Sequence, residues 1–250
     1  MEAYHAFAAV YDRLMEEIPY EDWCGYVTGL LAEQGIQDGL LLELGCGTGT
    51  MTELFAARGF DMIGVDNSEE MLAQAMEKEA ADPHGILYLL QDMREFELYG
   101  TVRAIVSICD SMNYLEDYED LVQVLRLANN YLDPKGIFIF DMNTVYKYRE
   151  QLGEQTIAEN REESSFIWEN YFDEGEMVNE YDLTLFIRDE DGRYSKYEET
   201  HYQKAFEISE VLKAVKEAGM ELVAVYDAFT REPVKETSDR VYFVVRECGK

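Results

Sequence analysis

The feature that most constrains the fold is a run of spaced glycines directly after a short apolar segment. Residues 39–44 read Gly-Leu-Leu-Leu-Glu-Leu, and Gly45, Gly47 and Gly49 follow. A short, continuous apolar segment is typical of a parallel strand that is buried on both faces. Glycines in the turn that follows let the backbone approach a ligand closely, because no Cβ intervenes. The pattern predicts a ligand-binding loop between a buried strand and a helix.

Strand-like and helix-like segments alternate through the first part of the chain. Gly59 is placed to end one helix, and Ser68, followed by two glutamates, is placed to cap the start of the next. The expected strands are residues 39–44, 60–66, 86–90, 104–109 and 136–141, and the expected helices are residues 5–16, 20–34, 50–58, 68–80 and 121–132. This alternation, with a turn at 133–136 before the fifth strand, predicts a doubly wound α/β sheet.

The pattern changes after the fifth expected strand. Strand-like stretches at 166–172, 177–188 and 193–205 are joined by acidic, glycine-containing turns, and a helix at 209–218 and strands at 221–229 and 240–247 complete the chain. Hairpin turns of this kind predict an antiparallel β meander. We therefore expect a seven-stranded, mostly parallel sheet formed by residues 1–152 and 207–250. Residues 153–206 are expected to form an inserted antiparallel β subdomain that acts as a substrate lid.

Composition narrows the range of partners and locations. Acidic residues outnumber basic ones 52 to 21, which gives a formal net charge of −31. A surface of that sign repels nucleic-acid phosphates and anionic membranes, so both are disfavoured as partners. The four cysteines are scattered and no metal-ligand spacing occurs. The first residues show no basic stretch followed by an apolar one, and no segment approaches the length of an apolar membrane span. The sequence predicts a cytoplasmic protein without a metal, as a monomer or a homodimer.

The residues around the glycines help to discriminate between cofactors. A dinucleotide site carries a third glycine at a position that is Thr50 here. Glu43, before the loop, is expected to bring a negative charge that suits a cationic cofactor and repels a pyrophosphate. Asp66 ends the second strand, where its carboxylate is placed to accept hydrogen bonds from both hydroxyls of a ribose. Asp66 suits a nicotinamide dinucleotide equally well, so that residue alone leaves both cofactors open.

Polar residues follow the next two strands at the same edge of the sheet. Asp92 and Met93 come after the third strand and are candidates for contact with an adenine, and Asp110 comes after the fourth. Ligands bind at the carboxyl edge of open α/β sheets, so these side chains are expected to converge there.

These motifs together resemble those of the class I S-adenosylmethionine-dependent methyltransferases. Residues 43–49, Glu-Leu-Gly-Cys-Gly-Thr-Gly, match the family's acidic glycine loop, residues 64–72 match its second-strand motif, and residues 91–93 match its adenine-contacting segment. The resemblance covers residues 35–145 and, more loosely, the last part of the chain. It implies S-adenosyl-L-methionine as cofactor and a Rossmann-like fold. The implied cofactor-binding residues are Tyr11, Glu43, Gly45, Cys46, Gly47, Gly49, Asp66, Asn67, Met71, Asp92, Met93 and Asp110.

Within this family, the segment from Tyr4 to Tyr11 and the meander resemble small-molecule N-methyltransferases, which implies a small-molecule methyl acceptor. The family's reaction is an in-line displacement at a sulfonium methyl, which rests on alignment and desolvation. Candidates to orient or deprotonate the acceptor are Asp110, Asn113 and Tyr114 after the fourth strand, Tyr4 and Tyr11 near the N-terminus, and Trp168 and His201 in the meander. Each also has a purely structural interpretation.

Three other functions stay open. A nicotinamide-linked oxidoreductase is disfavoured by Glu43 and Thr50, and an RNA methyltransferase by the net charge. A regulator that binds S-adenosylmethionine without transferring its methyl group fits the same cofactor motifs.

Overall fold

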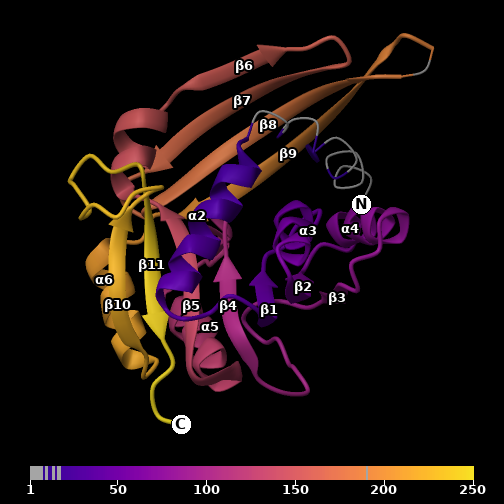
Figure 1. Ribbon diagram of the computed structural model, residues 1–250. Helices are drawn as coiled ribbons and strands as arrows, with labels where there is room; N and C mark the ends of the chain where they lie inside the picture. The colour runs from indigo at the N-terminus through magenta and orange to yellow at the C-terminus, as the bar shows by residue number, and fades with distance from the viewer. Residues whose placement is uncertain (1–7, 9–10, 13–14, 16–17, 190) are drawn as a thin grey trace.

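A seven-stranded sheet forms the centre of the computed structural model, which describes residues 8, 11–12, 15, 18–189 and 191–250 (Figure 1). Its strands are β1 (Gly39–Leu44), β2 (Phe60–Asp66), β3 (Leu87–Leu90), β4 (Val102–Ser107), β5 (Leu132–Asn143), β10 (Glu221–Asp227) and β11 (Arg240–Arg246). They lie in the order β10-β11-β5-β4-β1-β2-β3. Strands β1 to β5 are mutually parallel, whereas β11 runs antiparallel to both of its neighbours. The expected doubly wound, mostly parallel sheet is confirmed.

Helices cover both faces of this sheet. They are α2 (Tyr20–Glu33), α3 (Thr50–Ala57), α4 (Glu69–Ala81), α5 (Tyr118–Tyr131) and α6 (Ile208–Glu217), with a short 3₁₀ helix η1 (Ser111–Tyr114) and a π-helical turn η2 (Lys147–Leu152). Alternate residues of β1 point to opposite faces: Leu42 and Leu44 pack in the core with α5 and α6, and Leu41 packs with α2 and α3. Burial on both faces explains why this strand is apolar at nearly every position.

The signals for helix ends that the sequence carries are confirmed. The Ser68 hydroxyl accepts a hydrogen bond from the Met71 amide at 3.2 Å, which makes Ser68 the N-cap of α4. Gly59 follows α3 with a φ of +97°, a left-handed conformation that glycine adopts without strain.

Several strand boundaries differ from those expected, and for two of them the backbone shows the reason. Strand β4 ends at Ser107 rather than at residue 109, because Cys109 and Asp110 have positive φ values of 61° and 56°. Strand β5 begins at Leu132, before the expected turn at 133–136. Lys135 has a φ of 65° there, and the pairing with β4 shifts register, so the turn is an irregularity inside the strand.

The inserted segment forms a separate antiparallel sheet in the order β6-β7-β8-β9. Its strands are β6 (Thr156–Asn160), β7 (Ser164–Asp173), β8 (Val178–Arg188) and β9 (Tyr194–Lys204). The meander of β7 to β9 was expected, but β6 was not. That edge strand is short and largely polar, so its sequence carries little signal. The second sheet extends over the end of the main sheet toward which β1 and β4 point (Figure 1).

Alanine substitutions at Gly49 and Gly47 test how tightly the side chains pack beneath the glycine loop. A Cβ at Gly49, where φ is +78°, would meet the Tyr88 hydroxyl and, at 3.0 Å, the Cβ of Ala75. A Cβ at Gly47, where φ is +55°, would have no atom within 4 Å. Alanine at either position costs about 1–2 kcal/mol of left-handed strain, and at Gly49 overpacking adds about 1–3 kcal/mol. We expect Gly49→Ala to lower the free energy of unfolding, measured by urea denaturation, more than Gly47→Ala does.

The double variant Gly49→Ala/Tyr88→Phe identifies the contact responsible. The Tyr88 hydroxyl is buried and has no hydrogen-bond partner among the described residues, so its removal relieves the overlap at little cost. Part of the lost stability should return in the double variant. Equal destabilisation by the two single glycine substitutions would contradict this packing.

Candidate functional site

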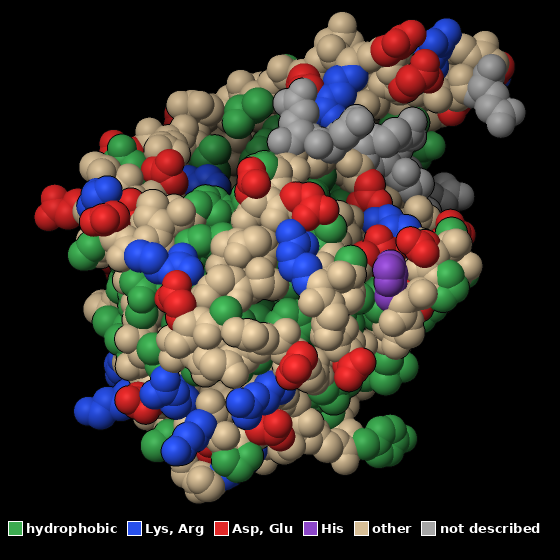
Figure 2. Space-filling model, viewed as in Figure 1, with side chains coloured by type: hydrophobic (Ala, Val, Ile, Leu, Met, Phe, Trp, Pro, Cys, Tyr) green, Lys and Arg blue, Asp and Glu red, His purple; other side chains and the backbone are tan. Residues whose placement is uncertain are grey.

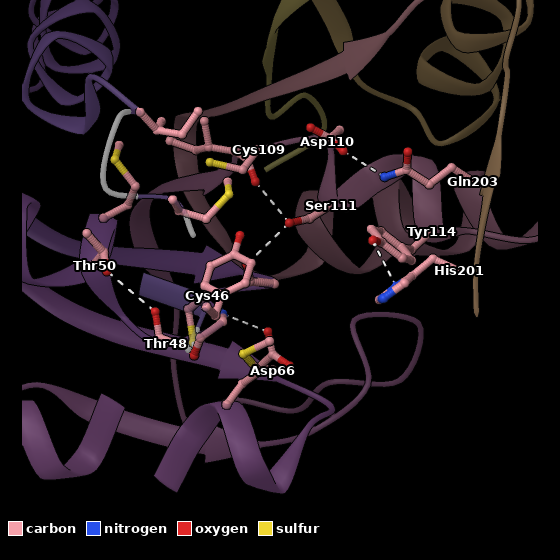
Figure 3. Close-up of a pocket in the computed structure, with 18 of the residues that line it drawn as sticks. Cys46, Thr48, Thr50, Asp66, Cys109, Asp110, Ser111, Tyr114, His201 and Gln203 are labelled. Atoms are coloured by element: carbon pink, nitrogen blue, oxygen red, sulfur yellow. Dashed lines mark hydrogen bonds between the residues drawn. The ribbon is translucent and has the colours of Figure 1, made fainter. Parts of the chain in front are cut away.

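A cavity of about 720 Å³ lies where the carboxyl ends of the central strands meet the second sheet. Its lining comes from the loops after β1, β2, β3 and β4, from β6 to β9, and from the segment around Tyr11. Figure 3 shows the arrangement, with Cys46 and Asp66 on one side and Tyr114 and His201 on the other. Open α/β sheets bind ligands at such an edge, beside the point where strand order reverses, and here β1 and β4 flank that point.

The glycine loop forms one wall. Gly45, Cys46 and Gly47 line the cavity, and the loop is anchored because the Gly45 and Cys46 amides donate to the carbonyl of Val65 at 2.8 and 3.0 Å. Gly49 does not line the cavity and instead packs beneath the loop. Its role is therefore to support the loop rather than to face a ligand.

Glu43 lines the cavity beside the glycine loop but is almost completely buried, with 3% of its surface exposed. The Thr52 hydroxyl donates to its carboxylate at 2.5 Å. Burial raises the pKa of Glu43 to about 8, the Thr52 hydrogen bond opposes this shift, and the charge of Asp66 adds to it. This raised pKa favours the protonated carboxyl group in the ligand-free protein, so the expected negative charge of Glu43 stays a prediction for the state with a cationic ligand bound.

Asp66 lies at the end of β2 and lines the cavity, as do Asn67 and Met71. The two carboxylate oxygens of Asp66 accept hydrogen bonds from the amides of Gly47 at 2.7 Å and Ser68 at 2.9 Å. Burial raises the pKa of Asp66, although these backbone hydrogen bonds oppose the shift. Each oxygen keeps a second lone pair that is available to a ligand.

Asp92 does not line the cavity, which contradicts its expected position at an adenine. Its carboxylate is held by the guanidinium of Arg94 at 2.7 Å, and Arg94 also reaches Asp120 at 3.2 Å. The neighbours Gln91 and Met93 do line the cavity. Contacts at this position therefore come from the residues on either side of Asp92.

Asp110 lines the cavity as expected, but it belongs to a cluster that the sequence did not predict. Arg240 donates to Asp110 at 2.5 Å and also to Asp141. Gln203 donates to Asp110 at 2.7 Å, as Figure 3 shows. Burial raises the pKa of Asp141, and Arg240 opposes that shift. Arg240 begins β11, which runs antiparallel, so its first residue lies at the carboxyl edge of the parallel strands.

Asn113 is not a candidate to contact a substrate. It is fully buried, and its side-chain amide donates to the carbonyls of Asn143 at 3.3 Å and Lys204 at 2.8 Å. Its side-chain oxygen accepts from the Asn143 amide at 2.9 Å. Asn113 therefore connects η1 to β5 and β9 and does not line the cavity, so the structure gives no support to its expected catalytic role.

Tyr114, next along η1, lines the cavity together with residues from the second sheet. Its hydroxyl lies 2.6 Å from that of Tyr181 and 3.3 Å from Nδ1 of His201. Trp168 lines the cavity from β7. The sequence singled out Trp168 and His201 but not Tyr181, which is one of 18 tyrosines in the chain.

Tyr11 lines the cavity, and burial raises the pKa of its hydroxyl. Its neighbour Asp12, which the sequence analysis missed, accepts a hydrogen bond from Thr48 in the glycine loop at 2.5 Å and pairs with Lys78. Tyr4 and most of the helix expected at 5–16 lie outside the described residues.

The described residues carry neither a metal-binding cluster nor a membrane-spanning helix. No cluster of three or more His, Cys, Asp and Glu side chains in that part of the chain is arranged to hold a metal ion. Within the same ranges, no helix is long and apolar enough to cross a membrane.

Comparison with known proteins places these features in a family. The family profile described as a methyltransferase domain matches residues 41–136. YqeM of Bacillus subtilis strain 168, a protein assigned to the methyltransferases, is 34% identical over 241 residues, which is 96% of this chain and 95% of that protein. The dTDP-3-amino-3,4,6-trideoxy-alpha-D-glucopyranose N,N-dimethyltransferase of Streptomyces venezuelae is 34% identical over 101 residues, 40% of this chain and 41% of that enzyme.

A solved structure agrees over the full length. The S-adenosylmethionine-dependent methyltransferase from Clostridium acetobutylicum ATCC 824 superposes with a TM-score of 0.89 at 27% identity, covering 98% of this chain and 99% of that one. With the profile match and the full-length relative, this agreement shows that the chain belongs to the class I S-adenosylmethionine-dependent methyltransferases.

Proposed function

We propose that this enzyme transfers the methyl group of S-adenosylmethionine to an amine nitrogen or a hydroxyl oxygen of a small molecule. The observation that carries the proposal is the cavity between the glycine loop and the second sheet, whose volume of about 720 Å³ suits a cofactor and a small acceptor. The similarity to a sugar N,N-dimethyltransferase supports a small acceptor. The net charge of −31 supports a small acceptor too, because it repels nucleic acid. On the face shown in Figure 2, acidic and basic side chains are interspersed.

The cofactor fits the loop side of the cavity. The open space beside Gly47, where a Cβ would meet no atom, allows a ligand to lie against the backbone. Asp66 is proposed to accept from the ribose hydroxyls, while Asn67, Met71 and Met93 surround the adenine. Glu43, which lines the cavity beside the loop, is proposed to stabilise the cationic part of the cofactor. When bound, the cofactor supplies an electrophilic methyl group on a sulfonium.

The acceptor is proposed to lie on the opposite side, beneath the second sheet. Residues 153–206 then act as a substrate lid, because Trp168, Tyr181 and His201 face the cavity from three of its strands. Tyr114 and Tyr11 are proposed to orient the acceptor, and Asp110 to fix the position of Gln203 in the roof. An enclosed site removes water from both reactants and aligns them, which is most of what this displacement requires.

Asp66 tests the cofactor assignment. Asp66→Ala should weaken binding of S-adenosylmethionine by about 1–3 kcal/mol, because the ribose hydroxyls lose their acceptor. Isothermal titration calorimetry measures the change. Asp92→Ala is the matched control, since that carboxylate pairs with Arg94 outside the cavity and its loss should leave the affinity unchanged. Unchanged affinity in Asp66→Ala, or an equal loss in both variants, would refute the assignment.

The raised pKa of Glu43 predicts that cofactor binding is coupled to the release of a proton. A positive charge nearby favours the ionised carboxylate, so binding should release the proton that a pKa of about 8 retains at neutral pH. Because only the ionised form attracts the cation, affinity should rise with pH up to about 8 in the wild type and less steeply in Glu43→Gln. Calorimetry in buffers of different ionisation enthalpy measures how many protons are released when the cofactor binds. Protons released by the cofactor itself contribute equally to the wild type and to Glu43→Gln, so the difference between the two reports on Glu43.

Equal proton release by the wild type and Glu43→Gln would show that this carboxyl group does not respond to the cofactor. Glu69→Gln, at an exposed carboxyl group at the start of α4, is the control and should behave as the wild type.

A further inference from the structure

The second sheet brings a connected series of polar side chains to the cavity. The Tyr114 hydroxyl lies 3.3 Å from Nδ1 of His201, and Nε2 of His201 lies 3.2 Å from Oε2 of Glu199. The Tyr181 hydroxyl lies 2.6 Å from that of Tyr114. Figure 3 shows the Tyr114 and His201 side chains next to each other, joined by this hydrogen bond. The contacts connect a buried carboxylate, through an imidazole, to a hydroxyl at the cavity surface.

We propose that Tyr114, His201 and Glu199 form a relay that removes the proton which the methyl acceptor must lose. This inference rests on the proposed function, because it assumes that the acceptor lies beneath the second sheet. Tyr114 is the group that would contact the acceptor. His201 and Glu199 act through it, as the proton acceptor and the residue that positions it.

The imidazole is held in a fixed orientation. Glu199 and His201 are two residues apart on β9, so they share one face of the sheet, and His201 pairs in register with Tyr181 on β8. The rings of His201 and Tyr181 stack with centroids 4.7 Å apart at 14°. The Tyr114 ring meets His201 edge-on, with centroids 6.0 Å apart. Contacts from three elements thus determine where each ring nitrogen points.

The hydrogen-bond partners determine the tautomer. An ionised carboxylate only accepts hydrogen bonds, so Nε2 of His201 carries the hydrogen that it donates to Glu199. In a neutral imidazole, Nδ1 is then the lone-pair nitrogen, and it accepts from the Tyr114 hydroxyl. The basic nitrogen therefore faces the cavity side of the relay.

Burial of Glu199 favours transfer of a proton toward His201. Glu199 is 7% exposed, and one of its oxygens has no hydrogen-bond partner within the described ranges. His201 is the ion-pair partner that the structure gives it. A buried carboxylate is stabilised by a neighbouring cation, so an imidazolium beside Glu199 offsets part of the cost of burying that charge.

The proposed step balances in atoms and charge. The lone pair of the acceptor nitrogen or oxygen forms a bond to the methyl carbon as the carbon–sulfur bond breaks and leaves its electron pair on sulfur. The acceptor's proton passes to the Tyr114 oxygen while the Tyr114 proton passes to Nδ1 of His201. The positive charge that begins on the sulfonium ends on the imidazolium beside Glu199. Tyr114, which is 44% exposed, then offers the proton a path to solvent.

Other titratable groups near the relay are already engaged. Three titratable side chains lie against His201: Tyr181 on β8, Tyr114 in η1, and Glu199 on the same strand as His201. Burial raises the pKa of Tyr181, with smaller contributions from Tyr114 and Asp110. Asp110 is itself held by Arg240 and Gln203. Among these groups, the His201 imidazole is the one whose lone-pair nitrogen lies within hydrogen-bond distance of the Tyr114 hydroxyl.

Nuclear magnetic resonance of the full chain with isotopically labelled histidine tests the relay without an acceptor. The chain has three histidines, so His201→Gln assigns the signal. We expect the neutral ring to carry its proton on Nε2, and the population with the proton on Nδ1 to increase in Glu199→Ala, which removes the acceptor for Nε2. A proton on Nδ1 in the wild type, or an unchanged distribution between the two nitrogens in Glu199→Ala, would overturn the proposal.

Turnover supplies the second readout, with labelled S-adenosylmethionine and a panel of small amines and alcohols. His201→Gln and Tyr114→Phe should each lower kcat/KM at pH 7 by about 10²–10⁴-fold and should alter the pH profile, while cofactor affinity stays constant. Thr200→Ala is the control, because Thr200 bonds to Asp182 and belongs to the opposite face of β9. A wild-type pH profile in His201→Gln would refute the relay. Absence of any turnover by the wild type would instead count against the proposed function, and the resonance experiment still decides the relay.

Discussion

The parallel pairing of β1 between β2 and β4 is the constraint on which the rest of the site depends. Chain order reverses at this point, so the loops after β1 and β4 leave the sheet in opposite directions and open a space between them. Asp66 at the end of β2 bonds to Gly47 in the loop after β1, and Ser111 after β4 donates to the Gly45 carbonyl. The cavity wall is thus cross-linked by the same strands that create it.

Desolvation dominates the electrostatics of this strongly acidic chain. The carboxyl groups at the surface remain hydrated, whereas burial raises the pKa of Glu43 and Asp66 at the cavity and of Asp141 in the interior. Of these three, Asp141 is compensated by a cation, Arg240, and Asp66 by backbone amides. Within the part of the chain that the structure describes, the hydrogen-bond partner of the Glu43 carboxyl group is the Thr52 hydroxyl, so we expect Glu43 to be the most sensitive of the three to a cationic ligand. Net charge therefore says little about protonation inside the site.

The sequence predicted best what is local and periodic. The bounds of β1 and β2 and the Ser68 cap follow from patterns within a few residues, and the structure confirms them. Asp92 and Asn113 do not line the cavity as expected, because a position after a strand does not reveal where a side chain points. Arg94 and Asn143 engage these two side chains instead. Arg240 is brought to Asp110 from 130 positions away by the antiparallel last strand, which no local pattern indicates.

The enzyme is proposed to transfer the methyl group of S-adenosylmethionine to a small molecule that lies beneath the second sheet. The most direct measurement incubates the enzyme and methyl-labelled S-adenosylmethionine with a cell extract that is separated by size into small molecules and macromolecules. The account predicts enzyme-dependent label in the small-molecule fraction, as an N-methylated or O-methylated product. Label confined to RNA or protein would contradict it.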